Sequence, residues 1–224
     1  MSIEILSPGL NTTIQDGGRL GFQDKGVPVS GFMDIKSAHL ANTLVTNELN
    51  TSVIEMTLLG IKFKATQAIT IAITGADMQP KLNGKSITMY KAVEIPKDGI
   101  VTFKGASSGV YGYIAVLGGF KIPRVLESKS TYVPAKLGGF KGRVLQKGDL
   151  LPVLHKTLKP VKSKVKAPDF LPSAQLLCLK GPEWDWFSQE SKTAFLNTIF
   201  TIGKDSNRIG IRLEIGRASC RERV

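Results

Sequence analysis

The chain has 224 residues, a formal net charge of +12, 42% hydrophobic residues and 21% charged residues. This length and composition are those of a soluble globular protein with a sizeable core, arranged as one large domain or two small ones. The longest apolar stretch, at 68–76, is about half of the roughly 18 residues that a membrane span requires. The acidic start MSIEIL does not resemble a secretory signal, and only Cys178 and Cys220 are present. A disulfide framework is thereby excluded, and a cytoplasmic location is expected.

The positive charge does not by itself indicate nucleic-acid binding. Five lysines fall at 156–166, a proline-containing stretch without acidic or aromatic residues. Proteins that bind single strands interleave aromatic residues with the positive charge. A solvated linker therefore explains this stretch better, and we expect no nucleic-acid partner.

Taken in chain order, the pattern predicts many short strands and two helices. The first helix is predicted at 34–49, with Asp34 as its N-cap, and the second at 188–200, capped by Ser188. Asn83-Gly84 predicts a two-residue hairpin turn at 81–86. The predicted strands are 2–6, 52–59, 61–65, 68–73, 85–90, 91–95, 100–105, 110–120, 143–153 and 175–181.

Many strands with few helices indicate a β-rich α+β fold. The lysine stretch divides the chain into a first β domain at 1–155, a basic linker at 156–168 and a shorter remainder at 169–214. The last ten residues, IGRASCRERV, resemble the translation of a sequencing-adapter oligonucleotide. We therefore expect 215–224 to be a non-native tail and the natural chain to continue differently.

The glycine-rich segment at 13–34 invites the hypothesis of a phosphate-binding loop. It contains neither of the two common phosphate-binding glycine motifs, and no helix follows its glycines at once. The GASSG match at 105–109 lies between two predicted strands, so it predicts a hairpin turn rather than a nucleophile elbow. His39 and His155 are the only histidines, so no metal site is expected.

What remains is a set of polar side chains on turns between strands. The strand running into Thr-Gly-Ala-Asp77 places a carboxylate at a strand end, where sites are often built. For each aspartate taken alone, an Asx-turn or a helix cap remains the simpler interpretation. The aromatic residues at 181–187 fit either the edge of a core or a ligand platform. The polar set comprises Gln15, Asp16, Arg19, Ser30, Asp34, Glu55, Asp77, Ser128, Ser130 and Thr131.

Several collinear segments resemble the biotin-dependent carboxyltransferase family. That family includes allophanate hydrolase subunit 2, the carboxyltransferase region of urea carboxylase, the C subunit of bacterial 5-oxoprolinase and a relative that antagonises a kinase inhibitor. The resemblance implies a β-barrel-like first domain and the start of a cyclophilin-like second β domain, cut short here. The segments are 13–34, 41–60, 73–84, 113–153, 179–187 and 205–214.

The resemblance also implies a function. We expect a subunit of an ATP-dependent 5-oxoprolinase, a lactam hydrolase that works with a companion subunit 1-type protein, the chain alone being inactive. ATP would act through the complex. The alternatives are a biotin-dependent carboxyltransferase for urea-like substrates, with biotin supplied by a partner, or a regulatory protein that antagonises a kinase inhibitor.

Glycine turns and an arginine suit the stabilisation of an oxyanion, and a desolvated aspartate suits a base. We therefore expect the turns at 13–34, 74–79 and 127–132 to line one cavity. The expected catalytic residues are Gln15, Asp16, Arg19 and Asp77, and the expected substrate-binding residues are Ser30, Asp34, Ser130 and Thr131.

Overall fold

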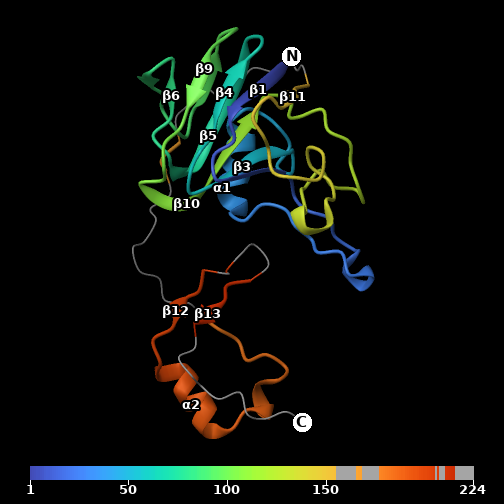
Figure 1. Cartoon of the computed structure of the whole chain (residues 1–224), viewed down its shortest axis with the longest axis vertical. Coiled ribbons are helices and arrows are strands. Elements are labelled where there is room, and N and C mark those ends of the chain that lie inside the picture. The colour runs from blue at the N-terminus through green and yellow to red at the C-terminus, as the bar shows by residue number, and fades with distance from the viewer. Residues whose placement is uncertain (155–164, 168–176, 205, 207–209, 215–224) are drawn as a thin grey trace. The chain divides into compact units, whose positions relative to one another are not determined.

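The computed structural model describes residues 1–154, 165–167, 177–204, 206 and 210–214. The chain divides into two compact units, Met1–Phe170 and Leu171–Val224 (Figure 1). Most of the predicted basic linker and all of the predicted non-native tail lie outside the described residues, so both stay predictions.

The first unit is built on two antiparallel sheets. Its six-stranded sheet has the order β11-β1-β4-β9-β6-β7, and its five-stranded sheet has the order β2-β3-β10-β5-β8. The predicted β-rich fold is confirmed, although the described strands form two open sheets and no closed barrel. The strands are β1 (Ser2–Ser7), β2 (Asn11–Gln15), β3 (Val53–Thr57), β4 (Lys62–Ala65), β5 (Ile69–Asp77), β6 (Lys81–Leu82), β7 (Lys85–Ser86), β8 (Ala92–Ile95), β9 (Ile100–Thr102), β10 (Ser108–Val116) and β11 (Leu150–Pro152).

The five-stranded sheet is buried on both faces. Side chains alternate across a strand, so Ile71 and Ile73 of β5 join a core cluster that also holds Ile3 and Phe63 of the six-stranded sheet. Ala72, between them, joins a second cluster. That cluster includes α1 (Ile35–Leu44), which packs on β5 and β10. The sheet therefore lies between the other sheet and a helix.

Helix α1 begins as predicted and ends earlier. Asp34 accepts a hydrogen bond from the Ser37 amide at 3.0 Å, as an N-cap does. The helix ends at Leu44 rather than near residue 49. The amide of Asn42 donates to the carbonyls of Leu49 and Thr51 at 2.9 and 2.7 Å, which folds the chain back over the helix end.

Several strand predictions need correction. Strand β2 was not predicted, because NTTIQ has no apolar alternation. The strand predicted at 85–90 exists only at Lys85–Ser86, and the one predicted at 143–153 only at Leu150–Pro152. The described residues 177–181 form no strand, in contrast to the prediction at 175–181. The described residues also form three short 3-10 helices, which are η1 (Gln23–Lys25), η2 (Val133–Ala135) and η3 (Trp184–Trp186).

The second unit has few elements. Its helix α2 (Gln189–Asn197) is capped by Ser188 as predicted, and β12 (Thr201–Ile202) pairs with β13 (Leu213–Glu214). The ring of Phe195 contacts those of Trp184 and Phe200. A cyclophilin-like fold for this unit stays a prediction.

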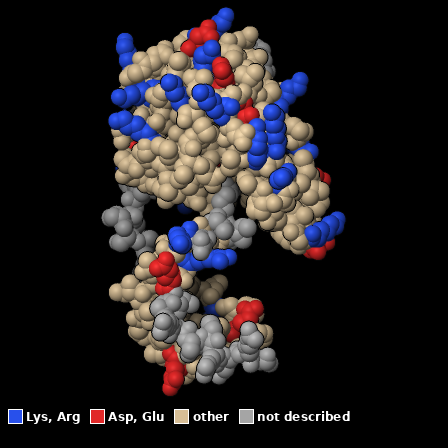
Figure 2. Space-filling view, in the orientation of Figure 1, with Lys and Arg blue, Asp and Glu red and all other residues tan. Residues whose placement is uncertain are grey.

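Two features bear on binding to membranes and to nucleic acids. Across the described residues, no helix combines the length and apolarity needed to cross a bilayer. Figure 2 shows lysine and arginine side chains scattered over the visible face of the first unit, with no single continuous stripe.

Candidate functional site

Asp16 is the centre of a buried polar cluster just after β2. Its Oδ1 atom accepts hydrogen bonds from the hydroxyls of Ser128 and Ser130, both at 2.6 Å, and from the Gly18 amide at 3.0 Å. Its Oδ2 atom accepts from the Lys129 amide at 2.6 Å. A carboxylate oxygen has about two acceptor positions, so Oδ1, with three donors, is fully occupied, while Oδ2 accepts one hydrogen bond. The arrangement holds the segment after β2 against the turn at 128–130.

Arg19 lies in the same cluster and is 1% exposed. Its guanidinium donates to the Ser130 carbonyl at 2.6 Å and to the Ser30 hydroxyl at 3.2 Å, while Nε has no partner among the described residues. Burial lowers the pKa of Arg19, and the charge of Asp16 opposes that shift. Gly138, at φ +64°, passes so close that a side chain there would overlap the Ser130 carbonyl and the Arg19 guanidinium.

Gln15 and Thr131 continue the cluster along β2. The Gln15 amide donates to the Thr13 hydroxyl at 2.9 Å and to the Thr131 carbonyl at 3.2 Å. The Thr131 hydroxyl donates to the Ile14 carbonyl at 2.9 Å. The structure therefore brings six predicted site residues together, which we call the Asp16 cluster: Gln15, Asp16, Arg19, Ser30, Ser130 and Thr131.

The Asp16 cluster is well suited to supporting a loop. Its charged groups, Asp16 and Arg19, are buried and bonded to serine hydroxyls and to backbone groups, which is how a protein offsets the cost of burying charge. To act as a base, Asp16 would have to be reached at its Oδ2 atom, and the residue is buried. The catalytic and binding roles expected for these residues stay predictions.

Asp34 lies apart from that cluster, at the start of α1. Its backbone amide donates to the Tyr113 hydroxyl at 2.7 Å, and Tyr113 donates to Glu55 at 3.0 Å. Glu55 also accepts from the Met33 amide at 2.9 Å. Burial and the nearby Glu55 charge raise the pKa of Tyr113 far above its usual range. Glu55 and Tyr113 therefore fix the entrance to the helix, with Asp34 as its cap.

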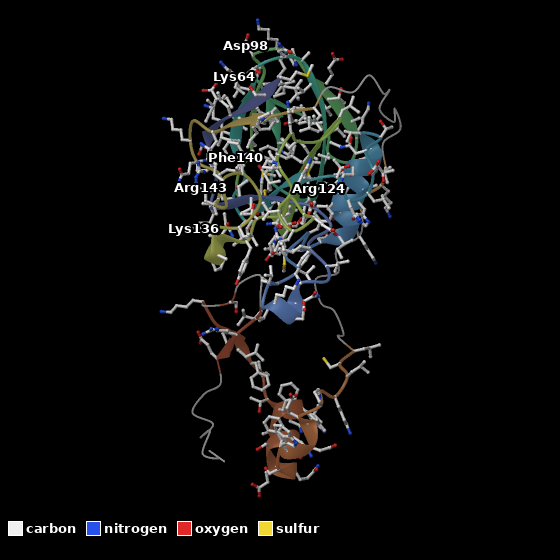
Figure 3. The ribbon with its side chains drawn as sticks, turned by 90° about the vertical axis from the view of Figure 1, so that its right-hand side faces the viewer. Lys64, Asp98, Arg124, Lys136, Phe140 and Arg143 are labelled. Atoms are coloured by element: carbon white, nitrogen blue, oxygen red, sulfur yellow. The ribbon has the colours of Figure 1, made fainter. Side chains whose placement is uncertain are left out.

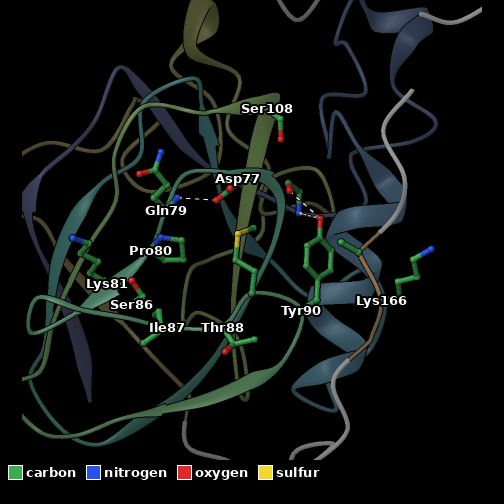
Figure 4. A pocket seen from close by; sticks show the side chains of 13 residues that line it. Asp77, Gln79, Pro80, Lys81, Ser86, Ile87, Thr88, Tyr90, Ser108 and Lys166 are labelled. Atoms are coloured by element: carbon green, nitrogen blue, oxygen red, sulfur yellow. Dashed lines mark hydrogen bonds between the residues drawn. The ribbon is translucent and has the colours of Figure 1, made fainter. Parts of the chain in front are cut away.

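Asp77 lines an open pocket of about 800 Å³, shown in Figure 4. Its Oδ1 atom accepts from the Gln79 amide at 3.0 Å and its Oδ2 atom from the Ser107 hydroxyl at 3.1 Å. We call this the Asp77 pocket, and its lining comprises Gly75, Asp77, Gln79, Pro80, Lys81, Ser86, Ile87, Thr88, Met89, Tyr90, Ser108, Lys166 and Ala167.

Tyr90 forms a rigid part of that lining. Its hydroxyl donates to the Gly75 carbonyl at 2.9 Å and accepts from the Gly75 amide at 3.1 Å. Burial raises the pKa of Tyr90, the contact with the Gly75 backbone lowers it, and the charges of Asp34 and Asp77 raise it further. Gly75 has φ +82°, and a side chain there would overlap the Tyr111 carbonyl, so this position requires glycine.

The structure separates Asp77 from the Asp16 cluster. The pocket that Asp77 lines contains no residue of 13–34 or 127–132, so the expectation of one cavity shared by these turns is wrong for the described residues. Gln15 pairs with Val53 at one end of the five-stranded sheet, where β10 ends at Val116. Asp77 pairs with Ser108 at the opposite end, where β10 begins. Strands β2 and β10 run in the same direction, and β5 runs antiparallel to β10. The chain therefore leaves β2 and β5 at opposite ends of the sheet.

Sequence reasoning missed much of the Asp77 pocket. Lys81 and Ser86 belong to the predicted hairpin, and Tyr90 ends a predicted strand, but none was proposed as a site residue. The available signal was the closeness of these polar residues to the strand end at Asp77.

Comparison with known proteins identifies the family of this chain. A family model described as "Carboxyltransferase domain, subdomain A and B" matches residues 25–223. The chain belongs to this carboxyltransferase family. It is 31% identical to the C subunit of 5-oxoprolinase from Escherichia coli (strain K12) over 212 residues, which are 95% of this chain and 68% of that protein.

Urea amidolyases are a second group of relatives. The urea amidolyase of Saccharomyces cerevisiae is 34% identical over 226 residues, covering 95% of this chain and 12% of that much longer protein. The crystal structure of the Kluyveromyces lactis urea amidolyase superposes with a TM-score of 0.81 at 34% identity, covering 96% of this chain and 14% of that one. The resemblance inferred from the sequence motifs is therefore confirmed at the level of the family.

Proposed function

We propose that this chain of the carboxyltransferase family is a subunit of an ATP-dependent 5-oxoprolinase, which opens 5-oxoproline to L-glutamate together with companion subunits. The observation that carries the proposal is the match to the C subunit of 5-oxoprolinase, which is 31% identical over 95% of this chain and 68% of that protein.

In this proposal, the chain contributes binding and orientation of the lactam. Ring opening breaks the bond between the ring nitrogen and the carbonyl carbon, and water supplies the oxygen of the new carboxylate. An acceptor for the ring N–H and a donor for the carbonyl oxygen are the groups the reaction needs near the substrate. The nucleotide, and the phosphate transfer that drives the reaction, belong to the companion subunits.

A carboxyltransferase acting on a urea-like substrate is the second candidate. It is favoured by the identity to urea amidolyase, which at 34% is slightly higher than the 31% to the 5-oxoprolinase component. Any biotin would come from a partner chain. The Asp77 pocket serves either reaction, since a cyclic amide and a urea present the same neighbouring N–H and carbonyl groups.

The experiment that separates these candidates is reconstitution. The chain is co-purified with the other subunits of a 5-oxoprolinase, and glutamate formation from 5-oxoproline is measured with and without ATP. ATP-dependent glutamate formation is the expected result. Carboxylation of urea by a biotinylated partner, without lactam opening, would support the carboxyltransferase. A tight complex without either reaction would indicate a regulatory binding protein instead.

A further inference from the structure

We propose that a positively charged turn of the first unit is a docking surface for an acidic segment of a partner protein. Its charged side chains are those of Lys136, Lys141, Arg143 and Lys147, which we call the basic turn. The inference rests on the proposed function only for the partner's identity, which would be another subunit of the 5-oxoprolinase. The Asp77 pocket takes no part in it.

The charges of the basic turn lie close together. The Lys141 ammonium lies 5.2 Å from the centroid of the Phe140 ring, and the Arg143 guanidinium lies 6.0 Å from the same centroid. The Lys136 carbonyl passes so close to Gly142 that a side chain at Gly142 would overlap it. Figure 3 labels Lys136, Phe140 and Arg143 near one another on the first unit. Several positive charges are therefore presented on one short segment.

Three of these four cations have no carboxylate partner. Lys136, Lys141 and Lys147 are exposed, and none of them forms an ion pair within the part of the chain that the structure describes. Arg143 is paired, since it donates to both carboxylate oxygens of Asp149 at 2.7 Å. Asp149 is also the only acidic residue at 128–149. The basic turn therefore keeps an excess of positive charge that a partner can neutralise.

The Asp16 cluster holds the basic turn in place. Gly138 lies against the Ser130 carbonyl and the Arg19 guanidinium of that cluster, and its own carbonyl accepts a hydrogen bond from the Gly142 amide at 2.9 Å. The buried polar groups that follow β2 thus anchor the segment from which the lysines project. This contact gives the Asp16 cluster a role as the support of a binding surface.

The backbone of the basic turn is fixed in an uncommon conformation. Lys136 has φ +52° and Lys141 has φ +60°. Left-handed backbone costs free energy for residues other than glycine, and it persists only where the surrounding structure imposes it. A backbone that is already ordered has less conformational entropy to lose when a partner binds.

The chemistry of the basic turn favours an acidic protein segment over other anions. Phe140 is partly buried and packs against the core, so its ring is not free to stack on a base or to enter a membrane. A duplex is usually followed by a stripe of positive charge, and Figure 2 shows no continuous one. Lysine ammonium groups make charge-assisted hydrogen bonds to carboxylates, and complementary charge also speeds association. A second copy of this chain, at a net charge of +12, would be repelled.

Binding to the whole chain is tested by the fluorescence anisotropy of a labelled octaglutamate peptide in about 50 and 150 mM sodium chloride. Saturable binding is expected, weakened severalfold at the higher salt concentration because exposed charges are screened. Exchanging Lys136, Lys141 and Lys147 together for glutamine should weaken binding by about tenfold or more, since three exposed ion pairs are lost. All three side chains are exposed, so the variant should keep the melting temperature of the parent.

A second triple variant is the matched control. It exchanges Lys36, Lys85 and Lys97 for glutamine, three exposed lysines that lie on α1, on β7 and in the turn before β9. The change in net charge is the same, so any loss caused by net charge alone would be equal in the two variants. The control should bind octaglutamate within about twofold of the parent.

Three results would overturn the inference. They are no binding of octaglutamate by the parent, equal losses in the two triple variants, and tighter binding of a short DNA duplex or of phosphatidylserine vesicles than of octaglutamate. The last result would assign the basic turn to phosphate groups instead of carboxylates.

The same two variants, mixed with the other subunits of a 5-oxoprolinase, separate this inference from the proposed function. Assembly should weaken by about tenfold or more with the basic-turn variant and stay unchanged with the control. If the complex opens 5-oxoproline but assembles equally well with both variants, the inference is wrong and the proposed function stands. If octaglutamate binds through the basic turn but no complex opens 5-oxoproline, the inference stands and the proposed function is wrong.

Discussion

At the scale of single residues, two aspartates at similar strand ends have acquired different surroundings. Asp16 accepts four hydrogen bonds and is buried, while Asp77 accepts two and faces an open pocket. Both aspartates could be predicted as site residues from the sequence, since each lies at the end of a strand and close to glycines. The number of hydrogen bonds that each carboxylate accepts depends on partners up to 114 residues away, such as Ser130. No local sequence pattern contains that information.

Asp16→Asn should therefore act on stability. An asparagine turns one acceptor oxygen into a donor that faces other donors, so we expect the free energy of unfolding to fall by about 3 kcal/mol. Urea denaturation measures it. Asp98→Asn is the control, because its 3.7 Å ion pair with Lys64 is exposed and should contribute less than about 1 kcal/mol (Figure 3). An Asp16→Asn chain as stable as the parent would contradict the supporting role.

A pH-dependent contribution comes from Arg143, which donates to both carboxylate oxygens of Asp149 at 2.7 Å (Figure 3 labels Arg143). Burial alone would raise the pKa of Asp149, but the hydrogen bonds from Arg143 and the Gln146 amide, with the nearby positive charges, lower it. A carboxylate with a lowered pKa stabilises the fold above its unfolded pKa, near 4, and this stabilisation is lost as the pH falls through the folded value.

Arg143→Gln should accordingly be less stable than the parent at pH 7, by about 1 kcal/mol, because the bidentate ion pair is gone. The difference should shrink as the pH falls below about 4, since Asp149 is then protonated in both chains. Urea unfolding between pH 2.5 and 7 gives the comparison. A difference that stays constant over this range would show that the ion pair is not its cause.

At the scale of elements, strands with clear alternation or long apolar runs were predictable, and so were helix starts with a capping residue. Strand β2 was missed because Asn11, Thr12 and Thr13 owe their strand conformation to pairing with β3. The end of α1 was misplaced because Asn42 turns the chain through backbone carbonyls beyond the helix. The separation of Asp16 from Asp77 follows from strand order and direction, which the sequence pattern did not determine.

Glycine turns are the elements that hold the Asp16 cluster, and Gly138→Ala tests this. Gly138 has positive φ and lies against Ser130 and Arg19, so the variant should lose about 3 kcal/mol or more of unfolding free energy. Gly148 has φ +86° with no atom within 4 Å of the added methyl group, so Gly148→Ala should lose only about 1 kcal/mol. Equal losses in thermal or urea unfolding would mean that backbone strain alone is involved.

At the scale of the whole molecule, the two units differ in how well they bury apolar side chains. Many large apolar residues of the second unit are exposed, Leu179 at 98% and Ile199 at 96% among them. Exposed apolar side chains offer a surface that a hydrophobic dye can bind. We therefore expect the 224-residue chain to bind a hydrophobic dye strongly, and a chain of residues 1–170 to bind it several-fold less. Equal fluorescence from both chains would contradict the conclusion that the second unit carries the exposed apolar surface.

In the proposed function, this carboxyltransferase-family chain binds a cyclic amide substrate in the pocket at Asp77. The most direct test is the KM for 5-oxoproline of the reconstituted complex, compared between Asp77→Asn and Asp98→Asn. We expect a KM at least about tenfold higher for Asp77→Asn and an unchanged KM for Asp98→Asn. Parent-like KM and kcat values for a folded, assembled Asp77→Asn complex would contradict it.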